Sequence, residues 1–325
     1  MSVDDGWMPC SDRSLEREDP LGGSAGFGER WFLVEIDGAW GAHAFLQSRL
    51  DPVLGRALVR RIETAGMRPL AIRRTGLRAD ERRRQSVWRW AVVDARPGSE
   101  SVSWGSVDDP ALLLDVPLDG SAGTASTDPV ICVCTHARHD QCCAVKGRAV
   151  VSALARQHPT LTWECSHLGG DRFAATLVVF PHALHYGRVP ASHATHLLDA
   201  YAAGQVDRRY LRGRSSLANV VQAAQGFARE ALDDSRIDSL ALVSSTAAAG
   251  LDGRPADALW TVVLDHDGTP VTVVVAQTLS EPLLSTCGAT RPGPVREFAL
   301  QSIESGRAVS VGDVPTRRIG SEPSD

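Results

Sequence analysis

Most of the cysteines in this 325-residue chain gather in one short stretch, beside several histidines. Five of the seven cysteines lie between positions 132 and 165. Thiolates and imidazoles concentrated in this way are the ligands that an iron–sulfur cluster or a zinc ion requires, and their clustering argues against disulfides spread through the fold. The cysteines of this stretch and the nearest histidines are Cys132, Cys134, Cys142, Cys143, Cys165, His136, His139 and His167.

The spacing of these residues predicts two loops that meet at one site. Cys134 and Cys143 flank the first loop, and Cys165 and His167 stand on the second. In an extended backbone, residues i and i+2 point to the same side, so Cys165 and His167 can both face one site. The glycine pair at 169–170 leaves room for a cofactor close to the backbone.

Packing is the competing explanation for each cysteine, because free cysteine is among the most buried residue types. Cys132 lies in the middle of an apolar run and is expected in the core. Cys142 is ambiguous, because only one of two adjacent residues usually faces a given site. His136 and His139 are expected to be ordinary loop histidines that touch solvent or donate to a backbone carbonyl.

The bulk composition is that of an ordinary globular protein. The chain is 43% hydrophobic and 22% charged, with a net charge of −5, which disfavours general binding to nucleic acid. No apolar run approaches the ~20 residues that span a bilayer, and the N-terminus has no signal peptide pattern. We therefore expect a cytoplasmic protein without a membrane or nucleic-acid partner, whose thiols stay reduced.

The order of elements indicates the α/β class, with three segments and a tail. We expect an N-terminal α/β domain over 1–125, a domain over 126–206 that carries the Cys/His cluster, a small α+β region over 207–305, and a polar, disordered tail over 306–325. The first two segments share a similar element order, and the second places its candidate ligands just after two strands, where open α/β sheets hold their sites.

Periodicity and turn signals give the expected elements. Asp51-Pro52 is typical of a helix start, and Asp267-Gly268 predicts a hairpin turn. Expected strands cover 31–36, 68–74, 87–94, 111–117, 130–134, 161–165, 173–180, 185–189, 259–264 and 271–276. Expected helices cover 52–65, 145–158, 193–203 and 217–231.

Several motifs together resemble the sucrase/ferredoxin-like family. They are Cys134-Thr-His-Ala-Arg-His-Asp-Gln-Cys-Cys143, Trp163-Glu-Cys-Ser-His-Leu-Gly-Gly-Asp-Arg-Phe-Ala175, His185-Tyr-Gly-Arg-Val189, Asp19-Pro-Leu-Gly-Gly-Ser-Ala25 and Arg212-Gly-Arg-Ser-Ser-Leu217. The resemblance spans most of the chain. It implies a thioredoxin-like ferredoxin domain that binds a [2Fe–2S] cluster.

The resemblance also implies a ligand pattern, from which this chain departs. In the family, a C-x8-C pair supplies two thiolates to one iron, which matches Cys134 and Cys143, and an H-x3-H pair supplies two imidazoles to the other. His167 matches the first histidine, but Asp171 stands at the second position. We expect Cys165 to be the fourth ligand, because thiolate is the usual ligand of such clusters, with Asp171 as the alternative.

The resulting hypothesis is an iron–sulfur protein for electron transfer or redox sensing, with one [2Fe–2S] cluster held by Cys134, Cys143, Cys165 and His167. No dinucleotide-binding fingerprint or P-loop is evident, so its electrons are expected to come from or pass to a redox partner protein. An electron carrier is favoured over a stand-alone enzyme. The alternatives are a thiol-dependent oxidoreductase of thioredoxin-like fold and a structural zinc protein.

Overall fold

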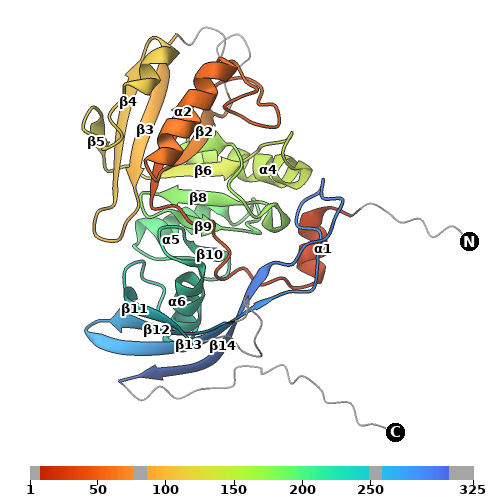
Figure 1. Ribbon diagram of the computed structural model, residues 1–325, viewed down its shortest axis with the longest axis vertical. Coiled ribbons are helices and arrows are strands. Elements are labelled where there is room, and N and C mark those ends of the chain that lie inside the picture. The colour runs from red at the N-terminus through yellow and green to blue at the C-terminus, as the bar shows by residue number, and fades with distance from the viewer. Residues whose placement is uncertain (1–7, 77–85, 249–257, 307–325) are drawn as a thin grey trace, which may run out of the picture.

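A computed structural model describes residues 8–76, 86–248 and 258–306 of the chain (Figure 1). Ten strands form one mixed sheet in the order β10-β9-β8-β6-β7-β2-β1-β3-β4-β5, and four more form a separate antiparallel sheet. The protein is therefore of the α/β class, as expected. The strands of the large sheet are β1 (Arg30–Glu35), β2 (Arg68–Arg74), β3 (Trp88–Asp94), β4 (Ser101–Val107), β5 (Thr124–Ser126), β6 (Val130–Cys134), β7 (Thr162–Cys165), β8 (Leu177–Phe180), β9 (Leu184–Tyr186) and β10 (Leu211–Arg214).

The large sheet consists of two units with the same topology. In the first unit, β1 is parallel to β2 and antiparallel to β3, and helix α2 (Pro52–Thr64) connects the parallel pair. In the second unit, β6 is parallel to β7 and antiparallel to β8, and helix α4 (Gln141–Gln157) makes the connection. Both units therefore share one β-α-β-β arrangement, which confirms the similar element order seen in the sequence.

The two units join through their edge strands β2 and β7, which pair antiparallel over three residue pairs. Arg73 and Glu164 face each other at this junction, and the guanidinium donates to the Glu164 carboxylate at 2.6 and 3.0 Å. Thr135, just after β6, donates to the same carboxylate oxygen at 2.9 Å. One carboxylate therefore ties the first unit to the start of the first candidate loop.

The helices of both units cover the same side of the sheet, and the opposite side carries most of the cysteines. Helix α2 packs on Phe32 and Val34, and α4 packs on Ile131 and Val133. Because strand residues alternate between the two faces, the neighbouring positions point the other way. These form a single core that runs across both units and includes Trp31, Leu33, Ile72, Cys132, Cys134, Trp163 and Cys165.

The third segment builds a small layer of its own. The amphipathic helix α6 (Asn219–Leu232) packs Val221, Ala224 and Ala228 against the four-stranded sheet. That sheet consists of β11 (Ala241–Ala248), β12 (Ala258–His266), β13 (Thr269–Leu279) and β14 (Arg296–Ser305). The predicted hairpin at Asp267-Gly268 joins β12 to β13, and Asp267 has a φ of 53° there. Among the described residues, the chain also forms helices α1 (Cys10–Glu16) and α5 (Ala194–Ala202).

Some predicted elements were wrong or were missed. The segment 111–117 is not a strand, because Asp109 caps a short 3₁₀ helix, η1 (Pro110–Leu114), by accepting from the Ala111 amide at 2.9 Å. The hairpin strand expected from 173 begins only at Leu177, after a second 3₁₀ turn, η2 (Asp171–Phe173). The sequence patterns did not predict α1, β4, β5, β10, β11 or β14.

The domain boundaries at 125, 206 and 305 stay predictions. Both α/β segments contribute to one sheet, and β10 extends it from the third segment. Most of the predicted tail, 307–325, lies outside the described residues. In the part of the chain that the structure describes, no helix is both long and apolar enough to cross a membrane.

The junction between the units leads to a stability prediction. Glu164→Gln should lower the free energy of unfolding by about 3 kcal/mol, because it leaves the half-buried Arg73 charge uncompensated. The matched control is Asp94→Asn, whose partner Arg96 is half exposed, and it should cost less than about 1 kcal/mol. Urea denaturation followed by circular dichroism measures both, and equal costs would contradict the role given to Glu164.

Candidate metal centre

The first candidate loop ends in a helix whose start is set by Asp140. The Asp140 carboxylate accepts from the backbone amide of Cys142 at 2.8 Å, which is the usual cap of a helix N-terminus. Helix α4 therefore begins at Gln141, four residues earlier than the predicted start at 145. This places both Cys142 and Cys143 in the first turn of the helix.

A glycine brings this helix against the end of β6. A Cβ atom at Gly147 would overlap the carbonyl oxygen of Cys134, so only glycine allows so close an approach. Cys143 lies one turn before Gly147 and therefore faces the same strand end. The Cys143 thiol hydrogen bonds to Cys134, which raises the pKa of Cys143 and lowers that of Cys134.

The second candidate loop is held from both sides. Ser166 is tied to β2 through its amide, which donates to the Ala71 carbonyl at 2.8 Å, and its hydroxyl, which accepts from the Ala71 amide at 3.2 Å. Gly169 and Gly170 have φ values of 87° and 82°, a conformation that favours glycine. The buried Arg212 guanidinium donates to the Gly169 carbonyl at 2.8 Å and so fixes the turn.

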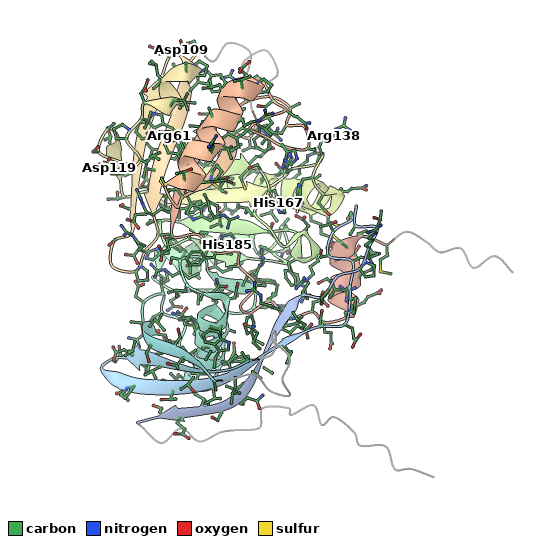
Figure 2. All side chains as sticks on the ribbon, in the orientation of Figure 1. Arg61, Asp109, Asp119, Arg138, His167 and His185 are labelled. Atoms are coloured by element: carbon green, nitrogen blue, oxygen red, sulfur yellow. The ribbon has the colours of Figure 1, made fainter. Side chains whose placement is uncertain are left out.

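Asp171 links the two loops. One of its oxygens, Oδ1, accepts from the Cys143 thiol at 3.2 Å and lies 3.1 Å from Nδ1 of His167. The other oxygen, Oδ2, lies 3.6 Å from Nε2 of His139, which comes from the first loop. The rings of His139 and His167 are 3.7 Å apart between centroids. Figure 2 shows His167 near the place where β6 and α4 meet.

The Asp171 carboxylate and the neighbouring His167 stabilise each other's charges, although burial disfavours both. Burial alone would raise the pKa of Asp171, whose side chain is only 3% exposed, but His167, the Cys143 thiol and His139 together lower it. Burial would lower the pKa of His167, but the Asp171 carboxylate raises it. The pKa of His139 is lowered, first by burial and then by its neighbour His167.

A cavity of about 380 Å³ opens onto this group. The side chains of His139, His167 and Asp171 form one wall, the Gly169-Gly170 turn another, and the loop at 285–286 closes it from the third segment. Arg172 and Arg212 also line the cavity, so its surroundings combine histidines and one carboxylate with two guanidinium groups. The space is large enough for a small inorganic group beside the ligand atoms.

The structure brings together most, but not all, of the predicted site residues. Cys134, Cys143, His167 and Asp171 form one chain of contacts. Cys165 lies opposite Cys134 on the neighbouring strand, in the same core as Cys132 and Cys134. The reason is that β7 ends at Cys165, so the alternation that would align it with His167 stops there.

The histidines of the first loop differ in their contacts. Nε2 of His136 lies 2.7 Å from the Gly41 carbonyl oxygen, as expected of a loop histidine. His139, for which the same was expected, instead faces Asp171 and His167. The sequence offered one signal for this role, namely that His139 lies between the two cysteines of the C-x8-C pair.

Comparisons with known proteins identify one family. The family model described as sucrase/ferredoxin-like matches residues 24–213, which is more than half of the chain. No curated protein matches. Among solved structures, the Cys59Ser variant of the thioredoxin-like [2Fe–2S] ferredoxin from Aquifex aeolicus is similar at 18% identity, with a TM-score of 0.23, over 26% of this chain and 96% of that chain.

The close approach at Gly147 leads to a prediction that a matched glycine controls. Gly147→Ala should lower the free energy of unfolding by about 1–3 kcal/mol, because the new methyl group overlaps the Cys134 carbonyl. Gly226, inside α6, has open space around it, so Gly226→Ala should raise stability by about 0.5–1 kcal/mol. Urea denaturation measures the free energy of unfolding of both variants. A Gly147→Ala variant that is more stable than the wild type would contradict the close contact between α4 and β6.

Proposed function

Because the chain belongs to the sucrase/ferredoxin-like family, we propose that it is a [2Fe–2S] protein for electron transfer or redox sensing. In this proposal, the cluster is held by Cys134, Cys143, His167 and Asp171. A cluster of this kind accepts and releases one electron, and the protein sets its potential through the ligands and their surroundings.

The residues present fit such a group. Two thiols and an imidazole are ordinary ligands of iron–sulfur clusters. Nδ1 of His167 is buried and has no aligned hydrogen-bond partner among the described residues, although it lies 3.1 Å from Asp171. To bind a metal, this nitrogen would release its proton and keep its place beside the carboxylate. The adjoining cavity supplies space next to it.

One observation carries the choice of ligands. A single carboxylate oxygen, Oδ1 of Asp171, lies within 3.2 Å of both the Cys143 sulfur and a nitrogen of His167. Ligands of one cofactor must lie close to one another, and these three do so. Asp171 also occupies the position of the second family histidine. These facts favour Asp171 over Cys165 as the fourth ligand.

His139 suits a positioning role beside this set. It lies 3.6 Å from the Asp171 oxygen that the other contacts leave open, and its ring is partly exposed. Groups that hold a ligand in place from behind tune both affinity and potential. We therefore assign His139 to the orientation of Asp171 rather than to the iron.

A thiol-dependent oxidoreductase is less well supported. A reactive cysteine needs a thiolate that is accessible at neutral pH. Cys143 is fully buried, and its pKa is raised by the hydrogen bond to Cys134 and by burial. A redox partner protein and a cytoplasmic location remain part of the proposal, with electrons exchanged through the partly exposed histidine side of the site.

The proposal is tested by expressing the protein anaerobically and measuring iron, acid-labile sulfide and the visible spectrum. We expect two irons and two sulfides per chain in the wild type. Cys134→Ala, Cys143→Ala, His167→Ala and Asp171→Ala should each lose the cluster, because each removes one of its ligands.

The controls are Cys132→Ala and Cys165→Ala, which remove buried thiols on the same face of the sheet. Both should keep the cluster. If Cys165→Ala loses it while Asp171→Ala keeps it, the ligand assignment is wrong. A colourless protein that carries one zinc at these residues would replace the iron–sulfur proposal by a structural zinc site.

The aspartate leads to a prediction about the reduction potential. Asp171→His should keep the cluster and raise its potential, because a neutral imidazole replaces an anionic carboxylate and histidine ligation raises the potential. Redox titration followed by electron paramagnetic resonance measures this change. Asp171→Cys is the control and should shift the reduction potential in the opposite direction. A reduction potential that falls in Asp171→His would argue against Asp171 as a ligand.

A further inference from the structure

A second group of thiols gathers on the other side of the α4 N-terminus. Cys142, next to Cys143, points away from the centre described above and toward Cys10 and Cys287. Cys10 is the first residue of helix α1, and Cys287 lies in the loop between β13 and β14, which Figure 1 shows as a blue coil that passes beside α1. Residues 132, 145 and 277 positions apart in sequence thus meet at one point.

The distances within this group fit a single metal ion. The three Sγ–Sγ distances are 3.1 Å between Cys142 and Cys287, 3.5 Å between Cys287 and Cys10, and 3.7 Å between Cys10 and Cys142. Zinc binds thiolates at ~2.3 Å in a tetrahedron, whose edges are then ~3.8 Å. The sulfurs therefore lie close to three corners of such a tetrahedron.

Asp140 lies at the fourth corner. Its Oδ2 atom is 3.6 Å from the Cys10 sulfur, and the ligand atoms of all four residues lie within 4.8 Å of one another. The carboxylate is held in place by two backbone amides, those of Cys142 at 2.8 Å and Cys287 at 2.7 Å. A ligand oriented in advance in this way loses little freedom when a metal binds.

A bound cation would compensate the negative charges that this group carries once its thiols ionise. Three thiols and one carboxylate lie together here, and all but Cys287 are buried. Thiols gathered around a carboxylate oppose ionisation unless a positive charge joins them. A divalent cation that displaces the thiol protons would supply that charge.

From this geometry, we propose that Cys10, Cys142 and Cys287 bind one Zn²⁺, with a carboxylate oxygen of Asp140 as the fourth ligand. The site would fasten α1 and the β13–β14 loop to the start of α4, next to the centre that contains Cys143. It is distinct from the proposed cluster and does not depend on it.

A two-iron cluster and a disulfide are both less consistent with the distances between these thiols. A two-iron cluster places two metal ions and their bridging sulfides between its ligands, so sulfurs gathered around one point suit a single ion better. A disulfide requires ~2.05 Å between its sulfurs, which is shorter than the 3.1 Å observed, and it would leave one thiol and the carboxylate unused.

The variants that test this proposal are expected to keep the fold. Helix α1 is also held by the Lys146–Asp12 ion pair and by Arg188, which donates to the Ser14 carbonyl at 2.9 Å. Cys287 lies in a partly exposed loop that the paired residues Leu283 and Gly293 close. Both Cys10→Ala and Cys287→Ala are therefore expected to fold, and circular dichroism checks that they do.

The experiment measures zinc in full-length protein purified anaerobically and saturated with Zn²⁺, followed by replacement with Co²⁺. We expect one tightly bound zinc at this site and a thiolate-to-cobalt charge-transfer band of a tetrahedral site. Cys10→Ala and Cys287→Ala should lose both signals. Cys132→Ala is the matched control and should keep them.

A cluster-site variant, Cys143→Ala, separates the two proposals. It should keep zinc at the second site whether or not the wild type binds iron. Zinc that disappears in Cys143→Ala but persists in Cys10→Ala and Cys287→Ala would overturn the second site. So would a Cys142–Cys287 disulfide found by peptide mass spectrometry in the anaerobic protein.

Discussion

The close contact between helix α4 and the end of strand β6 is the constraint on which both thiol groups depend. Gly147 permits it, because any side chain there would overlap the Cys134 carbonyl. Asp140 fixes the rotation of the first turn by capping it. Adjacent residues on a helix point about 100° apart, so Cys143 turns to Cys134 and Cys142 turns to Cys10 and Cys287. One helix start thereby serves two separate sets of ligands.

The repeated topology explains how the site is supported. Both units have the same β-α-β-β order, but within the described residues only the second carries thiols at its strand ends. The first unit acts as a scaffold: it contributes β2, whose Ala71 binds Ser166 of the second loop, and Gly41, whose carbonyl contacts His136. The ion pair between Arg73 and Glu164 fixes the joint between the units. A fold of one unit alone would lack these contacts on its edge strand.

The sequence was sufficient for features that local chemistry determines. Alternating and apolar runs located most strands of both units, and Asp267-Gly268 located the hairpin turn. The strand predicted over 111–117 was wrong, because a run of leucines suits either a strand or a capped 3₁₀ turn, and only the contact of Asp109 with the Ala111 amide decides between them. Contacts between distant segments could not be predicted, because nothing in the sequence near Cys10 or Cys287 indicates that these residues meet. Cys165 stays a prediction that rests on the usual preference of clusters for thiolate, because the alternation of an extended strand ends with β7 at Cys165.

The central claim is that one cluster is bound by two thiolates on one side and by an imidazole and a carboxylate on the other. Mössbauer spectroscopy of the oxidised wild-type protein, reconstituted anaerobically with ⁵⁷Fe and sulfide, tests it most directly. We expect two iron sites in equal amounts, one with purely sulfur ligands and one with the larger isomer shift of mixed nitrogen and oxygen ligation. Two equivalent iron sites with only sulfur ligands, or no bound iron, would contradict it.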